Sequence, residues 1–290
     1  MKVAVIGAEG QLGREIVAAF AAAGEAVTPL AHADIEVASM ESVEGALREM
    51  RPDLVVNTAA FHHVERCEDD PARAFAVNSL GARHVAQVTD SLGAKLLHIS
   101  TDYVFDGVKE TPYLETDPAS PLNAYGNSKL SGEHFVRCTN PRHFVVRVSA
   151  IYGAHPCRAK AGLNFVDLML RLAREKEEIR VVDDEIVSPT PTVGVARQVV
   201  LLARTTDYGL YHASAEGSCS WYEFARAIFD LTAAKVRLER AKPGDFPRKA
   251  PRPKYSVLEN AALKGRSLNL FTDWRNGLET YLASRQAERG

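Results

Sequence analysis

The sequence has few cysteines, and they lie far apart. Cys67, Cys138, Cys157 and Cys219 include no Cys-x-x-Cys pair. A zinc ribbon needs such pairs, and a small disulfide-stapled domain needs a denser set of cysteines. The sequence therefore predicts neither of these, and a reducing compartment suits it best.

Long hydrophobic runs and an excess of one charge are also missing. The longest wholly apolar run covers residues 16–23, far short of the ~18 residues needed to cross a bilayer. The apolar run before Gly7 is too short for the core of a signal peptide. The formal net charge of −2 gives no electrostatic reason to expect nucleic acid or a membrane as a partner. We therefore expect a cytoplasmic protein with neither partner.

In the first half of the chain, short apolar runs alternate with helical patterns. Strands are expected at residues 2–6, 26–30, 53–57, 95–100 and 144–148, and helices at residues 11–23, 42–50, 71–92 and 121–138. Apolar strands separated by helices are typical of a parallel sheet that is covered on both faces. The pattern predicts an α/β fold with a doubly wound parallel sheet of the Rossmann type.

The alternation becomes irregular after residue 150. Helices are expected at residues 164–174 and 221–232, short strands at 179–182 and 209–213, and a loop rich in proline and basic residues at 241–254. We predict a first domain over residues 1–150 and a second, smaller α/β lobe over residues 151–290. Some segments of the second half are expected to return to the first domain.

A glycine turn follows the first expected strand. Gly7, Gly10 and Gly13 are spaced three residues apart and open the first helix. The first glycine of such a turn permits a tight bend, the second lets a pyrophosphate approach the backbone, and the third lets the helix pack closely on the strand. The helix N-terminus then offers free N–H groups to the phosphates. This placement predicts a dinucleotide site over residues 1–150.

The end of the second strand favours one form of the dinucleotide. An NAD-binding fold often has an acid there for the ribose hydroxyls, but the sequence reads Leu30, Ala31, His32. Arg14 follows the last glycine and would attract a 2′-phosphate. We therefore favour NADPH and leave NADH open, with Asp34 and Ile35 beside the adenine.

Tyr125 and Lys129 stand four positions apart in the segment NAYGNSKLSGE. This spacing places both side chains on one face of a helix. A nearby ammonium favours the phenolate form of tyrosine, which makes the phenol a better proton donor to a carbonyl oxygen. Ser100 and Thr101 end a strand at the carboxyl edge of the sheet, where a hydroxyl would hold the same carbonyl.

Longer motifs surround these residues. They are STDYVFDG (100–107), TDPASPLNAYGNSKLSGE (116–133), NTAAF (57–61), Val64 with Glu65, AVN (76–78), GLNFVDLML (162–170), SPT (188–190), GLYHAS (209–214) and RPKYSVL (252–258). Together they resemble the dTDP-4-dehydrorhamnose reductase family, within the extended short-chain dehydrogenase/reductase superfamily. The resemblance covers nearly the whole chain.

The resemblance implies an oxidoreductase that uses NADPH or NADH to reduce the 4-keto group of a nucleoside-diphosphate 6-deoxysugar, such as dTDP-4-dehydro-L-rhamnose, to an alcohol. It makes Tyr125 the proton donor, Lys129 its helper and a ligand of the cofactor ribose, and Thr101 the hydroxyl that orients the carbonyl. The remaining implied ligands are Gly7, Gly10, Gln11, Leu12 and Gly13 for the pyrophosphate, Ala59, Ala60 and Phe61 beside the cofactor, and Asp102, Tyr103, Asn164 and Arg252 for the nucleotide sugar.

The chain departs from the family pattern in three segments. Ala150 stands where the family usually has a tryptophan against the sugar, Glu185 and Val187 are substituted in the segment before SPT, and Tyr255 replaces an asparagine. None of them is among the catalytic residues. The identity of the sugar and of the nucleotide base therefore stays open.

Two other functions stay open. One is a nucleotide-sugar epimerase or dehydratase on the same fold, and Asp102 beside Thr101 keeps the dehydratase in view. The other is a non-catalytic subunit that is similar to the regulatory subunit of methionine adenosyltransferase. The family also leaves a homodimer open, and it offers weak support for Mg²⁺, because Glu15 matches one position associated with that ion.

Two further segments carry hypotheses. The segment 61–70 contains two histidines, a cysteine and several acids, but His62 and His63 are adjacent and do not share a helix face, so we expect no metal site there. Contact of His62 or His63 with the substrate is a hypothesis, as is closure of a cationic loop bearing Arg158 and Lys160 over a diphosphate.

Overall fold

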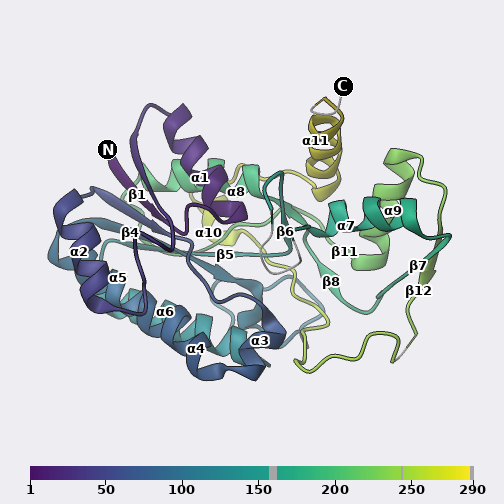
Figure 1. Ribbon diagram of the computed structural model, residues 1–290, viewed down its shortest axis with the longest axis horizontal. Helices are drawn as coiled ribbons and strands as arrows, with labels where there is room; N and C mark the ends of the chain where they lie inside the picture. Colours follow the sequence, from purple (N-terminus) through teal and green to yellow (C-terminus); the bar gives the residue numbers. More distant parts are fainter. Residues whose placement is uncertain (157–161, 243, 288–290) are drawn as a thin grey trace.

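The computed structural model describes residues 1–156, 162–242 and 244–287. Figure 1 shows a sheet with helices on both faces and, beside it, a smaller lobe built around α7, α9 and α11. Within the described residues, no helix is long and apolar enough to span a membrane.

Six parallel strands form the central sheet, in the order β10-β5-β4-β3-β1-β2. Their bounds are β1 Lys2–Ile6, β2 Ala26–Leu30, β3 Leu54–Asn57, β4 Lys95–Thr101, β5 His143–Val148 and β10 Gly209–His212. The inner strands are apolar and buried on both sides because helices cover both faces. The predicted doubly wound α/β fold is confirmed.

Each face of the sheet has its own helical layer and its own apolar core. α1 (Gln11–Ala22) and α8 (Thr192–Ala203) pack on one face, and α2 (Met40–Met50), α5 (Gly81–Ser91) and α6 (Ala124–Thr139) pack on the other. The sequence patterns did not predict α8. Together with β10, it brings two segments of the second half of the chain into the layered sheet.

The helix expected over residues 71–92 is interrupted, which corrects that prediction. It consists of α4 (Pro71–Phe75), a π-helical turn η1 (Ala76–Leu80) and α5. In η1, the Asn78 amide nitrogen donates to Phe61 O (3.0 Å) and Ser128 Oγ (2.9 Å), and its oxygen accepts from Phe61 N (2.8 Å). The wider turn thus ties the loop after β3 to α6, and such turns are frequent at functional sites.

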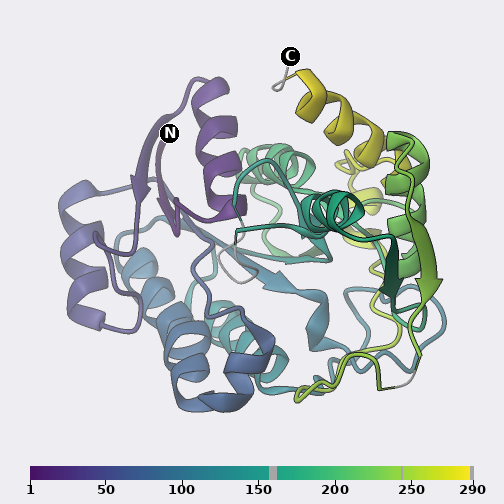
Figure 2. The same cartoon turned by 45° about the vertical axis from the view of Figure 1, so that its right-hand side comes forward.

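The second lobe packs its own helices around a separate apolar core. α7 (Phe165–Glu175), α9 (Trp221–Thr232) and α11 (Trp274–Ala287) enclose Phe224 and Trp274, both fully buried. Parallel strands β7 (Glu178–Val181) and β12 (Arg237–Arg240) flank them, as Figure 2 shows at the right. Shorter elements connect these parts. β6 (Ile151–Tyr152) pairs with β9 (Thr190–Pro191), and β8 (Ile186–Val187) pairs with β11 (Cys219–Ser220); the others are α3 (Val64–Asp69), the 3-10 turn η2 (Asp102–Val104) and α10 (Ala261–Gly265).

The glycine turn explains how α1 lies so close to β1. Gly7 has a φ of +77°, and a Cβ atom placed there would lie 2.6 Å from Thr58 Oγ1. A Cβ atom on Gly13 would lie only 2.2 Å from Gly7 O. The third glycine is therefore required for helix–strand packing, as the sequence predicted.

Gly13→Ala should lower the free energy of unfolding by ~1–3 kcal/mol, because the added methyl group overlaps the Gly7 carbonyl. Urea unfolding of both proteins measures this. Gly45→Ala in α2 is the matched control: a methyl group at that position would meet no neighbouring group within 4 Å, so alanine there should raise stability by up to ~1 kcal/mol. Equal stability of Gly13→Ala and the wild type would contradict this account of the turn.

Candidate active site

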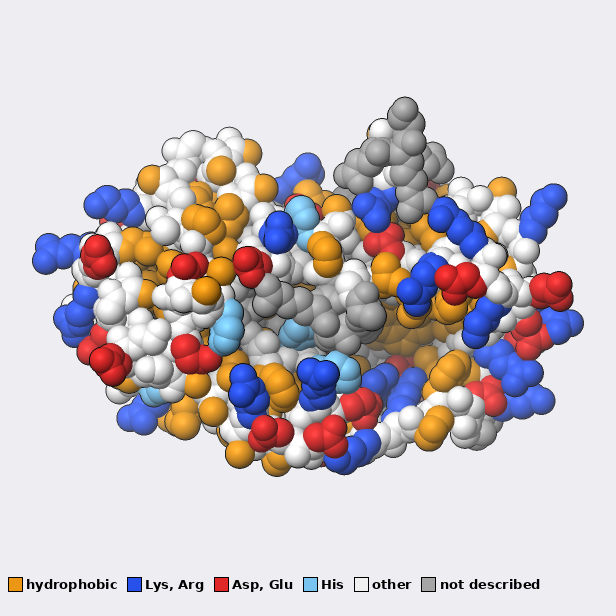
Figure 3. All heavy atoms as spheres, in the orientation of Figure 1, with side chains coloured by type: hydrophobic (Ala, Val, Ile, Leu, Met, Phe, Trp, Pro, Cys, Tyr) orange, Lys and Arg blue, Asp and Glu red, His pale blue; other side chains and the backbone are white. Residues whose placement is uncertain are grey.

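The site lies at the carboxyl edge of the sheet. The chain leaves β1 toward β2 on one side, and β3 lies on the other side of β1. Ligands bind in the crevice at such a switch point of a doubly wound sheet. On the face drawn in Figure 3, the surface is hollowed where the sheet meets the second lobe, and histidine and basic side chains lie around the hollow.

A cavity of about 220 Å³ opens beside the glycine turn. Among the residues predicted to bind the cofactor, it is lined by Gly7, Gly10, Ile35, Ala59, Ala60 and Phe61; Glu9, His32, Thr58 and Arg73 also line it and were missed by sequence reasoning. This cavity reaches Gly7 and Gly10 just before the first turn of α1, and the N-terminus of a helix suits a dinucleotide pyrophosphate.

The other predicted cofactor ligands lie close to this cavity. Gln11 and Leu12 are buried, and Gln11 Nε2 donates to His155 O (3.1 Å) and Gly153 O (3.4 Å). Asp34 Oδ2 accepts from Ala31 N (2.7 Å). A neighbouring cavity of about 560 Å³ includes Asp34 and Arg14 in its lining.

Tyr125 belongs to the first turn of α6. Asn123 caps that helix, its Oδ1 accepting from Gly126 N (2.8 Å). The Tyr125 phenol lies close enough to the Thr101 hydroxyl, at the end of β4, for that hydroxyl to act on its pKa. The Tyr125 ring packs edge-on against Tyr103 with the centroids 5.9 Å apart. The structure thus brings the predicted Thr101 and Tyr125 together.

Burial is the main influence on the Tyr125 pKa, and it raises that pKa above its ordinary value; the Thr101 hydroxyl acts in the opposite direction. Lys129 is not among the groups that act on the Tyr125 pKa, so the expectation that it lowers this pKa gains no support. Lys129 points instead toward β4, where Nζ donates to Ile99 O (2.6 Å) and lies 3.2 Å from His98 Nε2. Burial lowers the pKa of Lys129 to about 8, and Glu133 partly offsets this.

Asp102 supports Thr101 from behind. Its Oδ1 accepts from Thr101 Oγ1 (3.0 Å), and its Oδ2 accepts from Ser149 Oγ (3.0 Å) and Ser256 Oγ (2.6 Å). Burial raises the pKa of the carboxyl, and the three hydroxyl donors act against that rise. The two serines were missed from sequence, and the role of Asp102 in the sugar pocket stays a prediction.

Ser100 is turned away from the site. Its hydroxyl donates to Glu133 Oε1 (2.5 Å), and Glu133 forms a buried bidentate ion pair with Arg147, with N–O distances of 2.7 and 2.9 Å. Of the two hydroxyls at the end of β4, Thr101 is therefore the one beside Tyr125.

The other predicted sugar ligands have protein partners. Asn164 caps α7 and donates from Nδ2 to Gly153 O (2.8 Å) and the Tyr281 hydroxyl (3.0 Å). Arg252 pairs with Glu65 (3.1 Å). Burial raises the pKa of Tyr103 to about 12, and the charge of Arg252 lowers it in part. Binding of sugar by these three residues stays a prediction.

The remaining hypotheses concern two histidines, a cationic loop and a possible Mg²⁺ position. His63 caps α3 by accepting from Arg66 N (3.4 Å), and His62 is exposed at the rim of the smaller cavity; neither fact tests contact with a substrate. Arg158 and Lys160 lie outside the described residues. Glu15 lies 3.8 Å from His155 Nε2, and the described part of the chain contains no cluster of three or more potential metal ligands, so Mg²⁺ gains no support.

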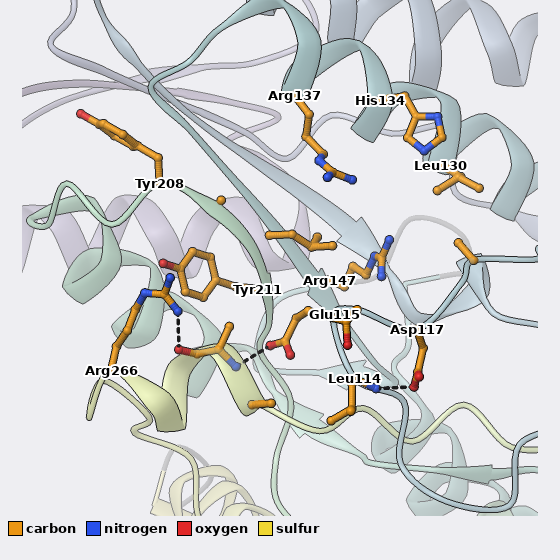
Figure 4. A pocket seen from close by; sticks show the side chains of 16 residues that line it. Leu114, Glu115, Asp117, Leu130, His134, Arg137, Arg147, Tyr208, Tyr211 and Arg266 are labelled. Carbon is orange, nitrogen blue, oxygen red and sulfur yellow. Dashed lines mark hydrogen bonds between the residues drawn. The ribbon is translucent and has the colours of Figure 1, made fainter.

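A larger cavity, of about 660 Å³, lies elsewhere, at the β10 edge of the sheet (Figure 4). It is bounded by α6, β10 and α10, with Arg137, Tyr208 and Arg266 among its labelled side chains. None of the predicted site residues lines it. Its size does not make it the candidate active site, because Thr101, Tyr125 and the glycines of the turn are absent from its lining.

The chain is similar to known proteins over nearly its whole length. A family model described as the RmlD substrate binding domain matches residues 1–287. Spore coat polysaccharide biosynthesis protein SpsK of Bacillus subtilis is 40% identical over 99% of this chain and 98% of its own length. A dTDP-4-keto-6-deoxy-D-glucose reductase of Streptomyces niveus is 36% identical over 94% of each chain.

A solved structure is also closely similar. The dTDP-4-dehydrorhamnose reductase of Bacillus anthracis, in complex with NADP, superposes with a TM-score of 0.93 at 36% identity and covers 98% of this chain and 99% of its own. The family model, the relatives and the solved structure each match nearly the whole sequence. They confirm the family resemblance that the motifs predicted. The chain therefore belongs to the dTDP-4-dehydrorhamnose reductase family.

Proposed function

We propose that the protein is an NADPH-dependent reductase of the 4-keto group of a dTDP-linked 6-deoxysugar, with dTDP-4-dehydro-L-rhamnose the favoured substrate. The observation that carries this proposal is the Thr101–Tyr125 hydroxyl pair at the carboxyl edge of the sheet, next to a glycine turn shaped for a dinucleotide. The similar enzymes of Bacillus anthracis and Streptomyces niveus support the cofactor and substrate class.

Thr101, Tyr125 and Lys129 have different roles in the proposed reduction. When bound, the reduced nicotinamide supplies hydride to the carbonyl carbon. Thr101 and Tyr125 hold the carbonyl oxygen, and Tyr125 donates its proton to that oxygen as negative charge develops. Because burial raises the pKa of Tyr125, the phenol stays protonated and ready to donate at neutral pH. Lys129 has a third N–H that is available to a ribose hydroxyl besides the contacts to Ile99 and His98.

The basic residues near the adenine end favour NADPH over NADH. Arg14 and Arg73 line the two cavities beside the glycine turn, and guanidinium groups are well suited to a 2′-phosphate. Arg73 lies over the Phe61 ring, 5.8 Å from its centroid. Binding measurements with both cofactors test this preference. A homodimer and the exact sugar remain predictions.

The test of the proposed function is oxidation of NADPH in the presence of candidate dTDP-4-keto sugars. A reductase consumes one NADPH for each sugar reduced. An epimerase or dehydratase keeps its nicotinamide through the cycle, so product formation without NADPH consumption would favour that alternative. A stoichiometric protein partner with no turnover would favour a regulatory subunit.

Tyr125→Phe should lower kcat by about 10²-fold or more, because it removes the proton donor and leaves the ring packed against Tyr103. NADPH binding, measured by titration, should change little. Tyr208→Phe is the matched control, because Tyr208 packs on Phe144 beside the larger cavity, away from the predicted site residues. Turnover of Tyr125→Phe equal to that of the control would remove Tyr125 from the mechanism.

Lys129→Met should lower turnover and also change how stability depends on pH. The pKa of Lys129 falls from 10.5 to about 8 on folding, so the unfolded chain binds this proton more tightly. Below pH ~8 the buried ammonium therefore lowers the free energy of unfolding by its full amount, up to ~3 kcal/mol. This loss disappears as the pH rises from ~8 to ~10.5.

Urea unfolding at several values between pH 7 and pH 10 measures this effect. The difference in unfolding free energy, wild type minus Lys129→Met, should become more positive as pH rises through that range. A difference that does not vary with pH would show that the buried lysine keeps an ordinary pKa.

A further inference from the structure

Helix α3 holds a loop of the second half of the chain through one carboxylate. Glu65 Oε2 accepts hydrogen bonds from Lys249 N (3.0 Å) and Ala250 N (3.1 Å), and its Oε1 accepts from Arg252 Nη2 (3.1 Å). In both Figure 1 and Figure 2, the yellow-green segment that follows β12 runs past α3. We name residues 249–252 the arginine segment.

A second acid of α3 holds the helix that carries Tyr125. Glu68 Oε1 accepts from Ala124 N (2.7 Å), the first residue of α6. The cap residue of the same helix, Asn123, donates from Nδ2 to Pro251 O (2.9 Å). One short helix thus fixes both the first turn of α6 and the arginine segment, and Asn123 joins those two to each other.

The arginine segment and the preceding Arg248 place positive charge beside Tyr103. The charges of Arg252 and Arg248 both act on the Tyr103 phenol, and the Tyr103 ring packs against Tyr125. Arg248 is itself paired with Glu185 of the second lobe. Within the described residues, the buried Nε of Arg252 has no hydrogen-bond partner. A free guanidinium donor beside the site suits an anionic group of a ligand.

We propose that Glu65 and Glu68 are positioning residues with separable effects: Glu65 holds Arg252 for the diphosphate of the nucleotide sugar, and Glu68 holds the first turn of α6 and with it Tyr125. This inference rests on the proposed function. A segment rich in proline and basic residues, outside any helix or strand, loses much conformational freedom when it is fixed. Because Glu65 already holds the arginine segment, substrate binding does not have to supply the free energy needed to order it.

The opposite role for Glu65 is competition with the substrate. If Glu65 instead competes with the substrate for Arg252, removing the carboxylate would free the guanidinium and tighten binding. The two roles predict opposite signs for the change in affinity, so a single measurement separates them.

The experiment compares Glu65→Met, Glu68→Met and Asp69→Asn. Asp69 also belongs to α3 and pairs with Lys249, but both of these side chains are more than half exposed. Asp69→Asn is therefore the matched control, and it should change no kinetic constant by more than about 2-fold. Glu65→Met should raise the KM for the nucleotide sugar by about 10-fold or more, with kcat and the KM for NADPH nearly unchanged. Glu68→Met should lower kcat by about 10-fold while the KM for the sugar changes little.

A second readout does not depend on turnover. Amide hydrogen exchange at residues 249 and 250 should become faster in Glu65→Met alone, and titration with dTDP should show weaker binding in that variant alone. Should Glu65→Met not fold, Glu65→Gln replaces it, because an amide oxygen still accepts from the two backbone N–H groups but no longer pairs with Arg252. It should show the same KM effect with normal exchange.

Each outcome decides the proposal. Equal losses of kcat and of sugar affinity in both Met variants, or dTDP binding by Glu65→Met that is unchanged or tighter, would overturn it. If the wild-type protein turns over no keto-sugar, the proposed function fails, while the dTDP titration and the exchange rates still test the role of Glu65.

Discussion

The arrangement of the active site depends on a buried carboxylate, Asp102. A buried charge is stable only when hydrogen bonds replace its water, and here the three donors come from three places: Thr101 at the end of β4, Ser149 just after β5, and Ser256 in the second half of the chain. Satisfying this one group therefore requires the two strand ends and the 252–258 segment to meet. Thr101 is oriented toward Tyr125 as a consequence of that requirement.

Helix α6 shows the same principle along its length. Tyr125, Lys129 and Glu133 follow one another at four-residue intervals, so they lie on one face of the helix. Burial increases along this row, from the half-buried Tyr125 to Lys129 at 2% exposure and Glu133 at 0%. Each buried member has its own partner, Ile99 O for Lys129 and Arg147 for Glu133. A helix face that a globular protein would ordinarily fill with apolar side chains is polar here. Burial lowers the pKa of Lys129, and Glu133 on the same face offsets part of that effect.

Local patterns predicted the parts of this molecule that local chemistry determines. The regular spacing of the three glycines, the apolar strands and the spacing of Tyr125 and Lys129 all act over a few residues, and the structure bears out the sheet and the turn. The π-helical turn was missed because one wide turn hardly alters a helical pattern of side chains. Ser149, Ser256, Glu133 and Arg73 were missed because their partners are distant in sequence, and nothing in the spacing of a serine or an arginine identifies such a partner.

The geometry around Ala150 shows that this departure from the family pattern lies outside the Asp102 network. The preceding residue, Ser149, is fixed by its hydrogen bond to Asp102, and the carbonyl of Ala150 accepts from Thr190 N (3.3 Å). Between these anchors Ala150 has a φ of +45°, a conformation that costs a residue with a side chain of order 1 kcal/mol. The backbone is held by groups other than the side chain, so alanine in place of the tryptophan usual in the family leaves the Asp102 network intact. Under the proposed function, the predicted proton donor and the predicted wall of the sugar pocket are therefore different residues, so alanine at position 150 leaves Thr101 and Tyr125 in place.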